Sequence, residues 1–113
     1  MRFERGTIVL ITLDRTHGHE QRGTRPCVLV SDAEVSADQR FPMLCVIPVT
    51  TARGEGAFYP HLLAGPSGLR KESWALVDQI RSVDKRRVRK VYGQVEPAEL
   101  DAIDEGLRLF LGI

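Results

Sequence analysis

The run FPMLCVIPV, residues 41–49, is apolar at nearly every position, which predicts a β-strand buried on both faces. Pro48 has no N–H to donate to a β-ladder, so we expect an edge, a bulge or the end of the strand there. Residues 6–13 and 27–31 have the same β-branched and apolar character. For the same reason as at Pro48, the second of these strands is expected to start at Pro26 and not before it.

Two further strands and a helix are expected after residue 70. Residues 74–83 and 88–95 alternate in character along the chain, which predicts strands and puts Asp78 and Gln79 in mid-strand. Pro97 suits the first position of a helix, with a carboxylate in the first turn. The helix carries one apolar stripe, which we interpret as core packing in preference to a partner surface: Leu100, Ile103, Leu107, Phe110 and Leu111.

These elements predict a mainly β (α+β) fold, a small, strongly bent antiparallel β-barrel with a C-terminal helix. The chain lacks the alternating βαβ units of a parallel doubly wound sheet. Its 113 residues fit one domain, 1–113. No apolar stretch approaches the roughly 20 residues of a membrane span. The first residues lack the apolar core of a signal peptide, so we expect a cytoplasmic protein with no membrane association.

Charge is nearly balanced in sum, at +1, but polarised along the chain. Residues 81–90 carry six cations against one carboxylate, and residues 96–105 carry five carboxylates and no cation. A basic segment is more often a solvated face than a binding site, so both interpretations stay open. Cys27 and Cys45 lie inside apolar runs without metal-ligand spacing, which predicts two buried, reduced thiols.

The loop HGHEQRGTRP at 17–26 is the first candidate for chemistry, because it gathers two histidines, a glutamate and two arginines beside glycines. Without a further ligand cluster this is a weak metal signal, and we expect neither a metal nor another cofactor. Arg25 stands out because Pro26 biases it to extended backbone where the loop enters a buried strand. Its alternative role is that of a rim arginine paired with a local carboxylate.

Polar side chains at strand ends form the second group of candidates. Thr50 and Thr51 follow the apolar run directly, so their hydroxyls lie at the mouth of a core strand, although such threonines commonly satisfy turn backbone. Asp78 or Gln79, if directed inward, belongs to a polar network or to a site. Trp74 offers a face for base stacking, but core packing is the commoner role.

Together these segments resemble the MazF/PemK family of toxin endoribonucleases. The most specific match is the glycine, glutamate, glutamine, glycine, arginine and proline pattern of the first loop. The matching segments keep their order over nearly the whole chain, at residues 5–10, 18–26, 45–51, 73 and 75–86.

The resemblance implies an SH3-like barrel, a homodimer, sequence-specific cleavage of single-stranded RNA and a cognate antitoxin that blocks the site. In the family, the arginine before the proline and the first threonine after the core strand are catalytic, which here are Arg25 and Thr50. Glu20, Gln21 and Gln79 fall at positions near the substrate groove. The remaining substrate-binding candidates are His19, Thr51, Ser73 and Arg81.

The chemistry of these residue types suits RNA cleavage. RNA supplies its own nucleophile, the 2′-hydroxyl, so the protein must align it, neutralise the phosphorane oxygens and manage two protons. A guanidinium offers a planar donor fork for phosphate but stays protonated at neutral pH, so Arg25 is expected to act electrostatically. Glu20 and His19 are candidate proton carriers. Expected products carry a 2′,3′-cyclic phosphate and a 5′-hydroxyl.

Two other functions remain open. One is a non-catalytic toxin of the same barrel type that poisons a DNA gyrase through the helix end at 109–113. The other is an RNA-binding module that uses residues 81–90 without cutting.

Overall fold

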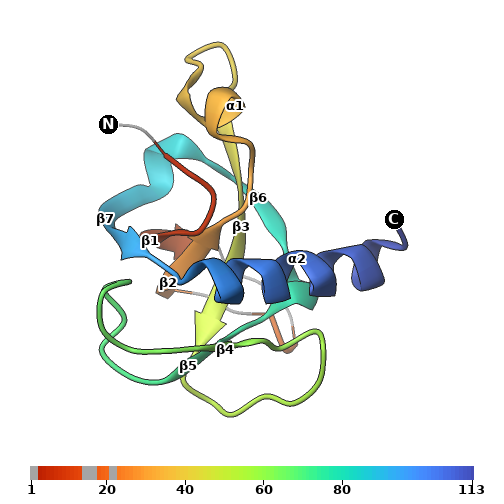
Figure 1. Cartoon of the computed structure of the whole chain (residues 1–113). Coiled ribbons are helices and arrows are strands. Elements are labelled where there is room, and N and C mark those ends of the chain that lie inside the picture. Colours follow the sequence, from red (N-terminus) through yellow and green to blue (C-terminus); the bar gives the residue numbers. More distant parts are fainter. Residues whose placement is uncertain (1–2, 14–17, 21–22) are drawn as a thin grey trace.

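A computed structural model describes residues 3–13, 18–20 and 23–113 (Figure 1). Within these residues, seven antiparallel strands make one sheet in the order β4-β5-β3-β2-β1-β7, with β6 joined to β3. The strands are β1 (Thr7–Leu13), β2 (Gly23–Leu29), β3 (Met43–Thr50), β4 (His61–Leu62), β5 (Ser73–Ala75), β6 (Arg81–Asp84) and β7 (Val88–Gln94). The helices are α1 (Ala33–Ala37) and α2 (Pro97–Leu111).

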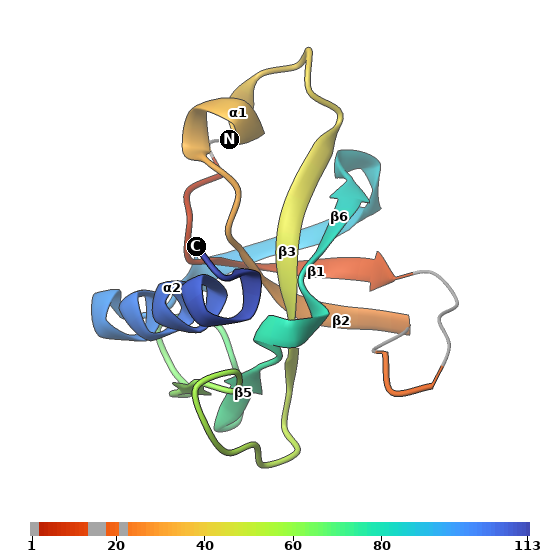
Figure 2. The same ribbon diagram turned by 90° about the vertical axis from the view of Figure 1, so that its right-hand side faces the viewer.

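The apolar run at 41–49 supplies the central strand, β3. It pairs with β2 along one edge, and along the other edge it pairs with β6 near its start and with β5 at its end. Figure 2 shows β3 crossing β1 and β2, so the sheet bends strongly into a half-open barrel. The expected mainly β, antiparallel barrel with a C-terminal helix is therefore confirmed.

Alternation along the strands builds two apolar clusters, one on each side of the sheet. Ile8, Val28 and Ile47 belong to the cluster that also includes Ile103 and Leu107 of α2. The other cluster lies on the opposite side and contains Val9, Cys27 and Val46 among others. Cys27 is buried and Cys45 half-buried, and both are free thiols. The two sides of the sheet therefore have separate cores, and a polar residue at a strand end belongs to one side only.

The helix α2 begins and ends as its sequence predicts. Pro97 is its first residue, and the Glu96 backbone N–H donates to the Glu99 side chain at 2.8 Å in a capping box. Gly112 ends the helix with a φ of 72°. The apolar stripe is core only in part, because Phe110 and Leu111 at its end are exposed. No helix among the described residues is long and apolar enough to cross a bilayer.

The expected single strand at 74–83 is wrong. The chain forms β5, then a 3₁₀ turn at Val77–Gln79, then β6. Ala75 pairs with Val49 and Arg81 pairs with Val46, so six residues of this segment advance along only three residues of β3. The surplus residues must leave the ladder, and Asp78 and Gln79 accordingly lie in the turn and not in mid-strand.

The expected start of the second strand at Pro26 is also wrong. β2 begins at Gly23, which pairs with Leu13 of β1. The ladder to β3 extends back only to Cys27, so the edge of β2 that faces away from β1 is open at Pro26. A missing N–H is tolerated at such an open edge.

Candidate functional site

Arg25 and Thr50 come to lie on the same side of the sheet, at the ends of neighbouring strands. In the β2–β3 ladder Cys27 pairs with Pro48, and Val28 pairs with Ile47. The same register continued by two residues sets Arg25 opposite Thr50. Since side chains two residues apart share a face, both project from the face that carries Cys27 and Pro48. Arg25 is exposed and Thr50 half-buried, which suits contact with a ligand.

The Thr50 hydroxyl has a defined local role that leaves its proton available. Its oxygen accepts a hydrogen bond from the Ala52 backbone N–H at 3.1 Å. This bond fixes the side chain where the chain turns after β3. A hydroxyl that accepts from the backbone can still donate its own proton to a ligand oxygen.

A pocket of about 530 Å³ reaches β3 at Pro48, two residues before Thr50, and is lined by Glu20, Pro48, Asp78, Gln79, Ile80, Arg81 and Ser82. Pro48 links the pocket to the strand of Thr50. The Gln79 amide donates to the His19 carbonyl at 3.1 Å, so the 3₁₀ turn contacts the β1–β2 connection. Three predicted site residues, Glu20, Gln79 and Arg81, therefore share one cavity, with His19 at its edge.

Arg81 belongs to the same face as Arg25. It pairs with Val46 of β3, whose side chain lies in the cluster with Cys27. Burial raises the pKa of the Cys27 thiol to about 12, and the nearby Arg81 cation opposes that shift. The thiol beneath the face is thus neutral at physiological pH and serves as a small apolar side chain.

Asp78 contributes an acceptor to the pocket. The Tyr59 hydroxyl donates to Asp78 Oδ2 at 2.7 Å, and this hydrogen bond raises the pKa of Tyr59. The other oxygen, Oδ1, is buried with no hydrogen-bond partner among the described residues. The sequence left open whether Asp78 or Gln79 is the inward-facing polar residue, and only Gln79 was expected to bind substrate.

Thr51 and Ser73, two further predicted substrate contacts, lie elsewhere. Both line a second pocket, on the other side of the sheet, together with Pro26 and Leu10. The Ser73 side chain is buried, and its hydroxyl donates to the Lys71 carbonyl at 2.8 Å. Gln21, another predicted site residue, falls outside the described residues, as does His17.

The basic segment at 81–90 contacts its own fold at several points. Arg86 pairs with Asp84 at 3.0 Å, and its guanidinium holds the pKa of that carboxyl below the usual range. Lys85 donates to the Asp38 carbonyl at 2.9 Å, and Arg89 donates to the Thr12 hydroxyl at 2.9 Å. Much of this segment is therefore held by contacts within the fold, which accords with a structural role for its charge.

Known proteins resemble the chain over nearly its full length. A family model described as PemK-like, MazF-like toxin of type II toxin–antitoxin system matches residues 4–111. Endoribonuclease MazF9 of Mycobacterium tuberculosis is 34% identical, with 98% of each chain covered. The MazF structure from Deinococcus radiodurans has a TM-score of 0.81 at 25% identity, covering 100% of this chain and 99% of that one. A mycobacterial endoribonuclease in complex with its cognate antitoxin shares the fold, with a TM-score of 0.76 at 22% identity and coverage of 97% and 95%.

Proposed function

The chain belongs to the PemK-like and MazF-like toxins of type II toxin–antitoxin systems, a family with named endoribonucleases, and we propose that it cuts single-stranded RNA without a metal ion. The 2′-hydroxyl next to the scissile phosphate gives its proton to one of the candidate carriers, Glu20 or His19, and attacks phosphorus. The bond to the 5′-oxygen of the following nucleotide breaks. One product ends in a 2′,3′-cyclic phosphate. The other begins with a 5′-hydroxyl, which takes up a proton.

The register of β2 and β3, which sets Arg25 opposite Thr50 when continued beyond the ladder, is the observation that carries this proposal. A guanidinium on one strand end and a hydroxyl on the next can both donate to the same phosphoryl group. Donors aimed at charge that develops in the transition state each contribute roughly 10²–10³ in rate. Arg25 therefore neutralises the phosphorane, while Thr50 donates to one of its oxygens.

The adjacent pocket supplies the groups for binding and proton transfer. Glu20 and His19 are the candidate proton carriers, since both lie on the β1–β2 connection next to the catalytic face. Gln79 and Arg81 contact the RNA strand, and we assign Gln21 to the same loop contacts. The unpartnered oxygen of Asp78 favours a base or ribose group that donates a hydrogen bond.

The proposal includes two protein partners. A cognate antitoxin blocks the site, as the toxin–antitoxin family implies. A second copy of the chain forms a homodimer, which the exposed apolar end of α2 supports: Leu109, Phe110, Leu111 and Ile113. Both partners and the RNA substrate meet the protein in the cytoplasm.

Incubation with a long RNA in EDTA tests the proposal, followed by sequencing of the 5′ ends that appear. We expect fragments that share a short motif at the cut and that accept a 5′-phosphate from a kinase without prior phosphatase treatment. Arg25→Ala, with an unchanged circular dichroism spectrum, should cleave at least about a hundredfold more slowly. Near-native cleavage by this variant would remove Arg25 from the mechanism, and intact RNA with inhibited gyrase supercoiling would establish the non-catalytic alternative.

A further inference from the structure

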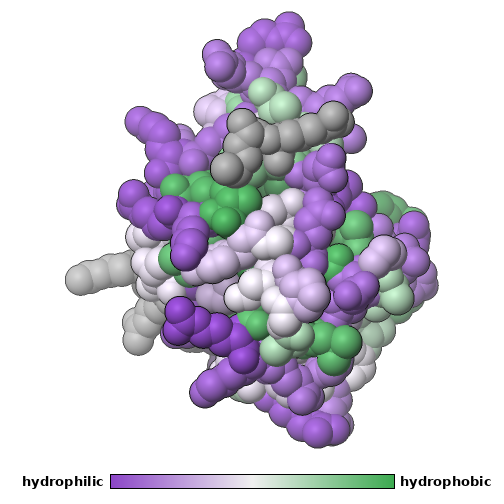
Figure 3. Space-filling model, turned by 60° about the vertical axis from the view of Figure 1, so that its left-hand side comes forward, coloured by the Kyte–Doolittle hydropathy of each residue, from purple (hydrophilic) through white to green (hydrophobic). Residues whose placement is uncertain are grey.

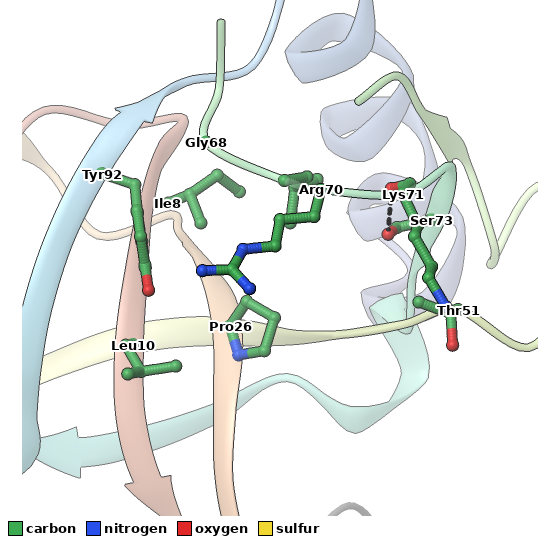
Figure 4. Close-up of a pocket in the computed structure, with 10 residues that line it drawn as sticks. Ile8, Leu10, Pro26, Thr51, Gly68, Arg70, Lys71, Ser73 and Tyr92 are labelled. Carbon is green, nitrogen blue, oxygen red and sulfur yellow. Dashed lines mark hydrogen bonds between the residues drawn. The ribbon is translucent and has the colours of Figure 1, made fainter. Parts of the chain in front are cut away.

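The second pocket has the chemistry of a binding site for an apolar group attached to an anion. It encloses about 350 Å³ over a floor of Ile8, Leu10, Pro26 and Leu69. Figure 4 shows the Arg70 guanidinium extending over this floor towards Tyr92. The pocket therefore has an apolar floor, an aromatic wall at Tyr92 and a cation at Arg70.

Positive charge borders the pocket. Arg70 and Lys71 are exposed at its rim, and Lys90 Nζ lies 5.0 Å from the centre of the Tyr92 ring. Among the described residues that line the pocket, none is acidic. The side of the molecule that carries β7 shows hydrophilic side chains around small apolar areas (Figure 3). Such a surface attracts a polyanion that also offers flat apolar groups.

Two glycines hold the pocket wall in place. Gly68 has a φ of +94°, and a Cβ there would lie 2.6 Å from the Tyr92 Cβ, so only glycine allows this close packing. On β7, a Cβ at Gly93 would collide with the Pro66 carbonyl oxygen. The Gly93 N–H donates to the Ser67 carbonyl at 3.0 Å. The turn at residues 65–68 is therefore held against β7. Arg70 lies two residues after this turn, so its backbone has a defined position.

The pocket is adjacent in sequence to the proposed catalytic pair. Pro26 follows Arg25, and Thr51 follows Thr50, and both line the pocket. Because side chains alternate along a strand, each neighbour projects to the opposite face, about 3.8 Å away along the chain. A strand of RNA held at Arg25 and Thr50 can thus continue past the point where β2 and β3 separate into this pocket.

We propose that this pocket binds a nucleotide flanking the cut, with its base on the apolar floor beside Tyr92 and its phosphates on Arg70 and Lys71. The proposal rests on the nuclease function above and extends it to a second RNA contact on the other face of the sheet. Single-stranded nucleic acids are commonly held by aromatic side chains and a cationic groove. An acidic protein segment is the competing occupant. The continuity of the pocket with the catalytic strand ends favours RNA.

Photocrosslinking of the unmodified protein tests which residues the RNA contacts. The probe is a mixed-sequence, 12-nucleotide 2′-fluoro RNA that contains 5-iodouracil and has no 2′-hydroxyl, so it binds without being cut. We expect mass spectrometry to find the crosslink at Tyr92. Crosslinks confined to other parts of the chain would overturn the proposal.

Loss of the two cations provides the second test. Arg70→Ala/Lys71→Ala should weaken binding of the same probe about tenfold, and should reduce the salt slope by about 1.4, since each phosphate contact contributes about 0.7. The control, Arg40→Ala/Arg108→Ala, removes two exposed cations that pair with Asp38 and Glu105 elsewhere. Equal effects of the two double variants would overturn the proposal. So would normal probe binding combined with lost affinity for the purified antitoxin.

The two proposals fail in different ways. Loss of the pocket contact leaves the cutting chemistry in place, so the Arg70→Ala/Lys71→Ala variant should keep its cleavage rate at saturating RNA. If the unmodified protein binds and crosslinks the probe at Tyr92 but cuts no RNA, the nuclease function fails while the pocket still binds nucleic acid.

Discussion

Thr50→Val tests the proposed chemistry with very little change in shape. Valine keeps the β-branched side chain and replaces the hydroxyl with a methyl group of similar size. The variant loses the hydrogen bond that Thr50 accepts from the Ala52 N–H at 3.1 Å. That bond is exposed, so water can replace it, and the loss of stability should not exceed about 0.5–1.5 kcal/mol.

The expected loss of activity is much larger than this structural cost. Removal of one donor to a developing oxyanion lowers the rate roughly 10²–10³-fold, about 2.7–4 kcal/mol. A domain with an ordinary stability of about 5–15 kcal/mol stays folded after a loss of about 1 kcal/mol. A hundredfold fall in rate therefore cannot come from unfolding.

Single-turnover cleavage of an end-labelled RNA measures this effect, because it reports the chemical step without product release. Thr50→Ser restores the hydroxyl and should recover the rate to within about tenfold of the original chain. Thermal melting of both variants checks the fold. A Thr50→Val protein that cleaves within about threefold of the original rate would show that the hydroxyl donates nothing in the transition state.

Three further predictions concern the framework of the site. Ile103→Ala should lower the free energy of unfolding in urea by about 2–5 kcal/mol, since this fully buried side chain leaves a cavity between α2 and the sheet; a loss below about 1 kcal/mol would contradict the packing. Arg5→Ala should lower the free energy of unfolding by about 1–2 kcal/mol. The Arg5 guanidinium donates to Asp104 through two nitrogens, at 3.0 and 2.5 Å, and to the Val30 carbonyl at 2.8 Å. An unchanged urea midpoint would refute this prediction. Cys27 should resist iodoacetamide at pH 8 in the folded protein and react once unfolded, because burial raises its pKa to about 12 and leaves little thiolate; rapid alkylation of the native chain, read by mass spectrometry, would show that the thiol is accessible.

The fold was predictable where a segment satisfies one local rule along its whole length. Residues 41–49 are apolar throughout and form β3, and residues 88–95 alternate and form β7 at Val88–Gln94. Pro97 and the neighbouring carboxylates mark the start of α2 correctly. In these elements, propensity, burial and capping all favour the same structure.

Local rules failed where two strands had to share one partner. Residues 74–83 satisfy the pattern of a single strand, but β3 offers this segment two separate stretches, paired with β5 and β6. The number of residues between β5 and β6 depends on how both strands are aligned with β3. The sequence of a single strand therefore does not reveal it. The same limit applies to the pocket beside Tyr92, which was missed. The glycines at 68 and 93 were a signal in the sequence, because close packing of the turn on β7 requires them.

The sheet is open beside the proposed catalytic pair because of Pro26. The ladder between β2 and β3 ends at the pair of Cys27 with Pro48, and beyond it β3 pairs with β5 at Val49. Pro26 has no N–H with which to extend the ladder from the other strand. Beyond the ladder, the side chains of Pro26 and Val49 lie on the α2 side of the sheet. Arg25 and Thr50 come next, and they are the first residues beyond the ladder on the face of the proposed catalytic pair. Their backbones are held by β1 and β5, at Ile11 and Trp74, and not by each other. Two rigid strands therefore present a guanidinium and a hydroxyl across an unpaired gap, which is the arrangement that a phosphodiester lying between them requires.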